Sequence, residues 1–282
     1  MVAKAWRACI IVVVCATALL PFLRTAHANN LSEAFLLPEL FEVMAAEGRT
    51  AIGEEGAAPL SSRELDIWRA ELAGIYDTDQ MLAAFVDALE QALEPMPEVR
   101  DDAIRFATTD LGQRIMRLEV SARAALLDDE VDEMARLALL DARASRQDTD
   151  DAGRLAMIRD RIAVNDLIEL NVSLGMNTSY AYYRGMLAEG ASAGFSAEDL
   201  LNLVQAQEPD IRRDVVDWIE SYFLMAYQPL SDAELQDYIE YSASPPGVAF
   251  NRAMFQAFDA VFVGLSGRVG RALGRILGSD TL

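Results

Sequence analysis

The residue types in this sequence that could do chemistry are mainly carboxylates. Two carboxylates can hydrolyse a glycosidic bond when they are correctly spaced and one of them has a raised pKa. Glu220, which Ser221 follows, is the candidate for such a role. A glutamate on a helix is more often a solvated surface residue. We therefore expect no catalytic residue and keep a carboxylate-dependent hydrolase of cell-wall glycan as the alternative.

One segment begins like a calcium-binding loop. In Asp148-x-Asp150-x-Ala152-Gly153 the glycine stands at the sixth position, as in an EF-hand loop. The twelfth position should supply a bidentate glutamate, but it is Arg159, whose charge would repel the ion. The sequence therefore predicts no metal site and no cofactor.

The composition beyond residue 28 excludes several other kinds of site. The 282-residue chain has 24 lysines and arginines against 45 aspartates and glutamates, and its single lysine, single histidine and both cysteines lie within residues 1–28. The rest of the chain cannot form Ser-His or Cys-His nucleophiles, Schiff bases, or imidazole and thiolate metal sites. Removal of residues 1–28 takes away three basic groups and leaves 21 against 45 acidic ones, a net charge of −24. Such a charge would repel nucleic acid, so we expect no nucleic-acid partner.

Residues 1–28 have the order of a secretory signal peptide. Two basic residues precede an apolar run over residues 8–23, and Ala26 and Ala28 stand at the −3 and −1 positions of a cleavage site. The run is shorter than the roughly 20 apolar residues that span a membrane. We expect cleavage after Ala28, export to the periplasm and no integral membrane segment in the mature chain. Retention of residues 8–23 as a short anchor is the alternative.

The sequence pattern predicts that the elements which position any site are all helices. Apolar residues recur three and four positions apart, and no stretch shows the alternation and β-branched enrichment of a strand. Capping patterns begin at Ser61, Asp77, Ser196 and Ser231, and Pro209 is among the prolines placed at helix boundaries. We predict an all-α multi-helix bundle with helices over 31–47, 61–75, 78–94, 97–107, 110–127, 129–145, 149–189, 197–206, 209–227, 232–242 and 245–277.

A shift of 135 residues aligns two helix corners. Thr109 then matches Ser244, and both are good N-cap residues. Gly112 matches Gly247 three positions later, where a missing Cβ lets the preceding helix approach closely. We therefore predict a bundle built from two similar helical hairpin repeats, and coincidence in an alanine- and leucine-rich chain is the alternative. The predicted repeats cover 29–147 and 148–282, with a polar linker over 143–151.

The second corner contains Glu-Leu, a five-residue spacer, an aromatic position and Ser-Pro-x-Gly, matched by Glu234, Leu235, Tyr241, Ser244, Pro245 and Gly247. This pattern resembles the hallmark of an exported bacterial family catalogued as domain of unknown function 2059. Ser242 departs from it, since a second aromatic residue is usual there. The resemblance covers residues 165–262, and the N-terminal half has a degenerate copy at Thr109 and Gly112. It implies an α-helical exported protein and no particular reaction.

The C-terminal helix concentrates its glycines on one side. Five glycines fall within an arc of roughly 120°, and three arginines share a narrower arc beside them. A frayed tail gives no reason for glycines to share a face, whereas a close helix–helix contact does. We predict that this face docks on another helix, in the same chain or a second copy, and that the arginines reach acidic groups. The residues are Gly264, Gly267, Gly270, Gly274, Gly278, Arg268, Arg271 and Arg275.

These features favour an exported, non-catalytic helical protein, most simply an envelope interaction or accessory protein. Its expected partner is an unknown envelope protein or a second copy of itself. Attachment to a membrane surface through the C-terminal helix is the lesser alternative, because anionic lipid repels a strongly anionic protein.

Overall fold

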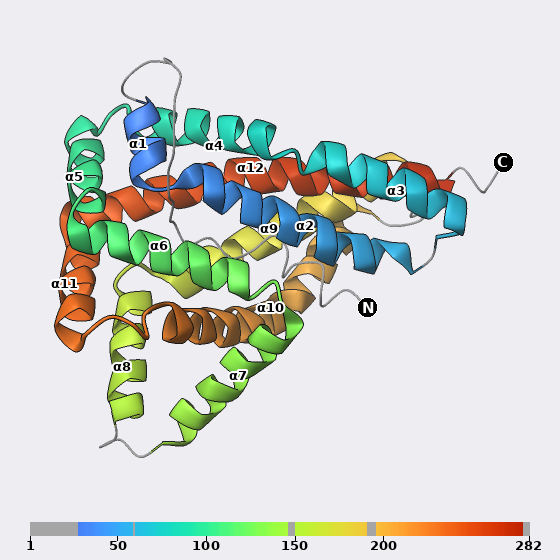
Figure 1. Cartoon of the computed structure of the whole chain (residues 1–282). Coiled ribbons are helices and arrows are strands. Elements are labelled where there is room, and N and C mark those ends of the chain that lie inside the picture. Colours follow the sequence, from blue (N-terminus) through green and yellow to red (C-terminus); the bar gives the residue numbers. More distant parts are fainter. Residues whose placement is uncertain (1–27, 59, 146–149, 191–195, 279–282) are drawn as a thin grey trace.

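The computed structural model describes residues 28–58, 60–145, 150–190 and 196–278, so all but the last residue of the predicted signal peptide lies outside the described residues. These residues form α-helices and no strand, which confirms the all-α prediction (Figure 1). None of the helices in the described ranges combines the length and the hydropathy of a membrane span. The helices are α1 (Ala28–Ala34), α2 (Leu37–Ala57), α3 (Ser62–Ile75), α4 (Thr78–Leu93), α5 (Pro97–Ala107), α6 (Asp110–Ala125), α7 (Asp129–Ala144), α8 (Asp150–Ala163), α9 (Leu167–Ala188), α10 (Ala197–Ala226), α11 (Asp232–Ala243) and α12 (Pro245–Gly278).

Several helices begin where the sequence supplies a cap. At the start of α4, the carboxylate of Asp77 accepts a hydrogen bond from the backbone N–H of Gln80. Such bonds satisfy N–H groups of the first turn that have no partner inside the helix. The capping boxes predicted for α3, α10 and α11 are confirmed as Ser61–Glu64, Ser196–Asp199 and Ser231–Glu234.

Two of the predicted helices are each divided into two helices in the structure. The helix expected over 31–47 is divided at Leu36, which has a φ of 56°, and α2 then continues to Ala57. Pro38 in the first turn of α2 explains the division, because proline has no N–H to donate and its ring excludes a preceding helical turn. The helix expected over 149–189 is also divided, at Asp166, where φ is again positive at 52°.

The predicted helix boundary at Pro209 is wrong. Helix α10 runs from Ala197 to Ala226 with this proline inside it. A proline in a helix interior costs about 3 kcal/mol. Ile211 and Val215 lie just beyond it and form a buried cluster with Val172 of α9, so the burial of one continuous helix face offsets the cost.

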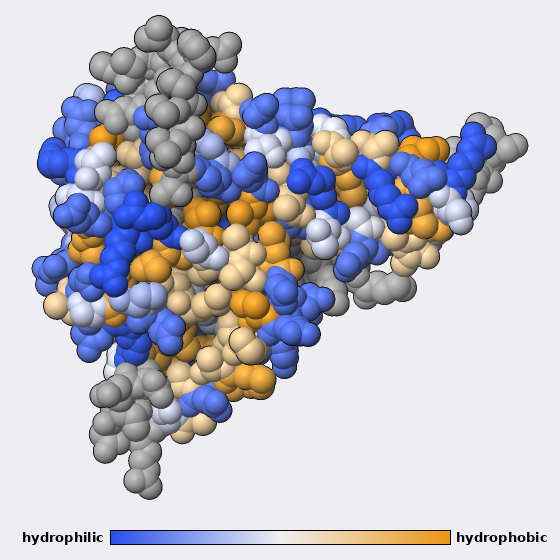
Figure 2. All heavy atoms as spheres, in the orientation of Figure 1, coloured by the Kyte–Doolittle hydropathy of each residue, from blue (hydrophilic) through white to orange (hydrophobic). Residues whose placement is uncertain are grey.

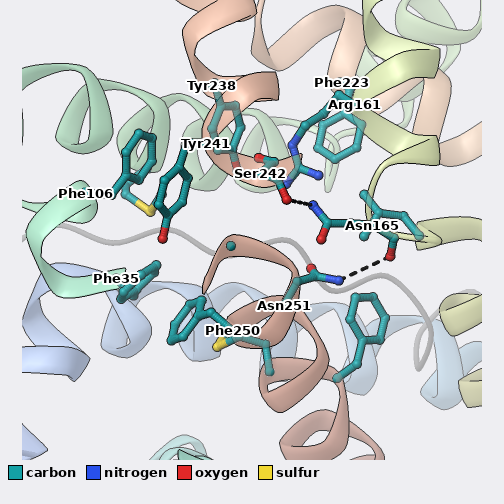
Figure 3. Close-up of a pocket in the computed structure, with 15 residues that line it drawn as sticks. Phe35, Phe106, Arg161, Asn165, Phe223, Tyr238, Tyr241, Ser242, Phe250 and Asn251 are labelled. Carbon is teal, nitrogen blue, oxygen red and sulfur yellow. Dashed lines mark hydrogen bonds between the residues drawn. The ribbon is translucent and has the colours of Figure 1, made fainter. Parts of the chain in front are cut away.

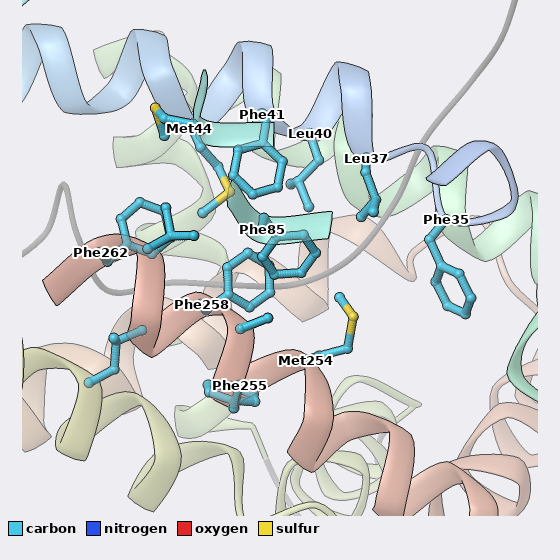
Figure 4. Packing of buried hydrophobic residues seen from close by; sticks show 14 of the residues in the cluster. Phe35, Leu37, Leu40, Phe41, Met44, Phe85, Met254, Phe255, Phe258 and Phe262 are labelled. Atoms are coloured by element: carbon cyan, nitrogen blue, oxygen red, sulfur yellow. The ribbon is translucent and has the colours of Figure 1, made fainter. Parts of the chain in front are cut away.

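The core is built around α12, which packs against α9, α4, α3 and α5 (Figure 1). The ring centroid of Phe258 on α12 lies 4.3 Å from that of Phe85, which lies 5.0 Å from that of Phe41 (Figure 4). This cluster of buried side chains extends from Leu31 to Ile276. Both predicted repeats therefore contribute to one core, while the repeats themselves and their boundary stay predictions.

Helix α7 lies outside this main core. Its buried Leu139 and Ala142 form a separate small cluster with Leu155 of α8, against which Leu224 of α10 packs. In Figure 1, α7 and α8 extend together below α10 as an arm. We call α7 and α8 the arm hereafter. Because so few of its side chains are buried, α7 presents much of its apolar surface outward.

Candidate functional site

The two helix corners have matching hydrogen bonds. In each, the hydroxyl of the cap residue donates to the carbonyl three residues earlier and accepts from the N–H of the glycine three residues later. These bonds measure 2.7 and 2.9 Å at Thr109, and 2.6 and 3.1 Å at Ser244. The rings of Phe106 and Tyr241, one from each corner, stack with centroids 3.7 Å apart. The corners are thus alike in local structure and in direct contact.

The other residues of the Ser-Pro-x-Gly motif support this corner and its helices. Leu235 is fully buried in the core. Glu234 caps α11 and forms an ion pair with Arg114 of α6. Hydrogen bonds from Ser231 lower the pKa of Glu234. Pro245 begins α12, where its missing N–H would have had no partner inside the helix. Each of these residues has a structural role in the corner or its helices.

Both corner glycines are expected to be intolerant of a side chain. A Cβ at Gly247 would overlap the carbonyl oxygen of Tyr241, and a Cβ at Gly112 would overlap that of Phe106. Gly247→Ala and Gly112→Ala should each lower the free energy of unfolding by about 1–3 kcal/mol, measured by urea denaturation. Gly153→Ala is the control, since a Cβ there meets nothing within 4 Å. A loss at only one corner would contradict their equivalence.

The glycine face of α12 contacts α9 of the same chain. A Cβ at Gly270 would overlap the carbonyl oxygen of Tyr182. The approach is reciprocal, because a Cβ at Gly185 of α9 would lie 2.5 Å from the carbonyl oxygen of Gly267. Missing Cβ atoms on both helices therefore allow their backbones to pack closely.

The glycines of α12 differ in how tightly they are enclosed. A Cβ at Gly274 would lie 2.9 Å from Cβ of Glu189, which is also too close. A Cβ at Gly278 would lie 3.5 Å from the carbonyl oxygen of Glu189, an ordinary contact. Gly264, which the sequence placed on the same face, has nothing within 4 Å of an added Cβ. The contact face thus excludes Gly264.

Arg268, Arg271 and Arg275 of α12 line a groove of about 550 Å³ beside α3. Arg275 lies 3.3 Å from a carboxylate oxygen of Glu71 and 3.7 Å from one of Glu189. Arg268 donates to a backbone carbonyl of α3 at 3.1 Å, and not to an acidic group as expected. No ion pair among the described residues engages Arg271. Most of the predicted interaction face is therefore used in contacts within the chain.

Glu220, the candidate acid or base, lies buried on α10 between two arginines of the arm. Its Oε2 accepts from Nε of Arg143 at 2.9 Å, and its Oε1 accepts from Nε of Arg159 at 2.7 Å. Arg143 also lies 2.7 Å from a carboxylate oxygen of Asp217. Burial lowers the pKa of Arg143, but its bonds to Asp217 and Glu220 more than offset this and raise it. Both oxygens of Glu220 are engaged, so it holds the arm to α10.

The calcium-like segment lies partly outside the described residues. Asp148 lies outside the described residues, and Arg159 at the twelfth position belongs to the Glu220 cluster. Across the described ranges, no group of three or more histidine, cysteine, aspartate or glutamate side chains could hold a metal ion.

A further groove, with a volume of about 670 Å³, lies between the arm and α10. Met134 and Ala138 of α7 form one wall, and Leu224 and Met225 of α10 form the other. Figure 2 shows apolar residues gathered over the α7 region. Six large apolar side chains are exposed in the described part of the chain, and four lie between residues 127 and 140: Leu127, Met134, Leu137 and Leu140.

Three charged residues line this groove, the acidic Asp141 and Asp232 and the basic Arg154. Arg154 is paired with Asp232, and the arginines of α7 are paired as well, Arg136 with Glu133 and Arg143 with Glu220. By contrast, no ion pair among the described residues engages four acidic residues of α7: Asp129, Glu130, Asp132 and Asp141. The groove therefore has apolar walls and one unpaired carboxylate, Asp141, and the other three lie elsewhere on α7.

Sequence reasoning did not identify this groove. The spacing of Met134, Leu137 and Leu140 by three residues is compatible with a buried helix face. Periodicity identifies apolar residues but does not show whether another helix covers them. The available signal is the acidic run at the start of α7, residues 128–133, whose charges also favour the helix dipole.

Comparison with known proteins yields no relative for this arrangement: no family model, no curated protein and no solved structure matches the chain. The resemblance of the second corner to domain of unknown function 2059 thus stays a prediction.

Proposed function

We propose that this chain is an exported, non-catalytic helical protein that binds a basic amphipathic helix of an envelope partner in the groove between the arm and α10. The observation that carries the proposal is the exposed apolar face of α7 beside this groove. Met134 is 64% exposed, Leu137 51% and Leu140 57%. Of these three residues, Met134 lines the groove itself. An exposed apolar surface rimmed by polar residues is typical of an interaction site.

The charges of the groove define the partner further. An amphipathic helix binds such a groove through apolar anchors that recur every three or four residues. Lysine or arginine beside these anchors would meet the unpaired carboxylate of Asp141, which lines the groove, within the wider negative charge of α7. Opposite charges speed association and discriminate against acidic partners. The occupant that fits best is therefore a helix with one apolar face and basic flanks.

The experiment uses a synthetic helix with leucines on one face and lysines on the other, and a matched peptide with glutamates in place of the lysines. Fluorescence anisotropy should show binding of the lysine peptide alone, and binding should weaken with salt. Met134→Arg should reduce the affinity at least about tenfold, which corresponds to about 1.4 kcal/mol.

Leu201→Arg is the matched control. Leu201 is exposed to a similar degree but lies at the start of α10, so the same charge change there should leave the affinity unaltered. Equal binding of both peptides, or equal loss in both variants, would contradict the groove. Turnover of purified cell-wall glycan that is lost in Glu220→Gln would favour the hydrolase instead.

Export is the second part of the proposal, and it is supported by the order of charged, apolar and small residues in 1–28. Amino-terminal sequencing of the protein recovered from the periplasm tests it. The expected first residue is Asn29, and an intact first residue would contradict cleavage.

A further inference from the structure

A buried arginine lies beside the two corners, and its charge is balanced only indirectly. Arg161 of α8 is 6% exposed, and its guanidinium carbon lies 4.6 Å from the ring centroid of Tyr238. Its Nη2 donates to the Tyr238 hydroxyl at 3.0 Å, and that hydroxyl donates to Glu119 at 3.3 Å. No ion pair joins Arg161 to a carboxylate among the described residues. Burial lowers the pKa of Arg161, but Tyr238, Tyr227 and Glu119 more than offset this, so the side chain stays charged.

Several polar atoms around Arg161 have no protein partner. Within the described residues, no protein group is in hydrogen-bonding reach of Nε and Nη1 of Arg161, Oδ1 of Asn165 or the hydroxyl of Tyr241. The amide of Asn165 donates to the carbonyl of Ser242 at 3.1 Å, so its Oδ1 is left as an acceptor. Buried polar groups in native proteins are normally hydrogen-bonded. A matching ligand would supply acceptors to Arg161 and a donor to Asn165.

These residues border a cavity of about 60 Å³ where α8 meets the two corners (Figure 3). One water molecule requires about 10–15 Å³ on this measure, so the cavity has room for roughly four water-sized groups. Its other walls include Phe35, Phe250 and Met254, which are apolar. The cavity therefore suits a small, singly charged ligand with a short carbon skeleton.

We propose that this cavity binds a short hydroxycarboxylate of about the size of glycolate. Its carboxylate supplies the negative charge and acceptors for Arg161, and the Tyr241 hydroxyl donates a further hydrogen bond. Its hydroxyl group donates to Oδ1 of Asn165. Larger anions exceed the cavity, and a doubly charged anion would face a single arginine. The site is separate from the groove of the arm, so either proposal can fail alone.

The test titrates the full chain with sodium glycolate, sodium acetate and sodium chloride at equal ionic strength, with the melting temperature and calorimetric heat as readouts. Glycolate should raise the melting temperature saturably, because it binds the folded state alone. Acetate lacks the donor for Asn165 and should bind roughly fivefold more weakly. Chloride should cause no saturable change. Equal responses to the three salts, or no saturable response, would overturn the proposal.

Two variants locate the site. Arg161→Met should abolish the glycolate response, whereas Arg275→Met, which removes an exposed arginine, should retain it. Asn165→Leu should bind glycolate and acetate equally, because the acceptor for the hydroxyl group is gone. If Arg161→Met does not fold, the proposal is still tested by the wild-type titration and by the comparison of glycolate with acetate in Asn165→Leu. Unchanged glycolate affinity in folded Arg161→Met would place binding elsewhere and reject the cavity.

Discussion

Gly270→Ala is expected to lower the free energy of unfolding by about 3 kcal/mol, the upper end for an overpacked site. The added Cβ would overlap the carbonyl oxygen of Tyr182, which belongs to a helix backbone and cannot rotate away. Helices α9 and α12 must then move apart, and their contact is the most extensive between any two helices of the described chain. For a chain of this size the loss corresponds to about 6–12 °C in melting temperature.

Gly264→Ala is the matched control, and the expected sign is opposite. Gly264 lies on the same helix, but a Cβ there meets nothing within 4 Å. Alanine is more favourable than glycine in a helix interior by up to about 1 kcal/mol, so this variant should be slightly more stable. Urea denaturation of both variants measures the difference. A stabilised Gly270→Ala protein would show that the close approach of the two helices is not a feature of the folded chain.

The second large effect is expected at the clamp formed by Glu220, Arg143 and Arg159. Replacing both arginines by methionine leaves Glu220 buried without a counter-charge, and Glu220 is only 5% exposed. Removing the partner of a buried charge costs about 3–5 kcal/mol. Glu220→Met should cost less, because both arginines are partly exposed and their guanidinium groups can reach water. The prediction is thus an asymmetry between the two sides of one ion-pair cluster.

Arg213→Met provides the reference for an exposed pair. Arg213 bonds Asp210 on the surface of α10, and such pairs contribute less than about 1 kcal/mol. Urea denaturation of the three variants should rank the double arginine replacement as the most destabilised and Arg213→Met as the least. If Glu220→Met were the most destabilised, the glutamate would have a role beyond balancing the two arginines.

The clamp also connects stability to the proposed function. Helix α7 has few buried apolar contacts of its own, and Arg143 ties it to α10 on the opposite wall of the groove. Loss of the clamp should therefore weaken peptide binding as well as folding. Stability and binding would then change together in the arginine variants, whereas Met134→Arg should change binding alone.

The sequence by itself determined the all-α class, the capping boxes and the local form of both corners. Each depends on groups within about four residues of one another, such as Ser231 with Glu234 or Ser244 with Gly247. The composition also excluded histidine, cysteine and lysine chemistry beyond residue 28, because residues that are absent cannot react. Nothing in the tertiary structure can alter these local properties.

Only the tertiary structure decided which of these features face one another. Gly264 and Gly270 share a side of α12, but of these two glycines only Gly270 lies against α9. Helix α10 continues through Pro209 because its buried face, with Ile211 and Val215, packs against Val172 of α9. Glu220 forms ion pairs because two helices of the arm bring their arginines to it. The groove beside α7 exists because no described helix covers Met134. Each outcome depends on a residue distant in sequence, which periodicity within one helix cannot specify.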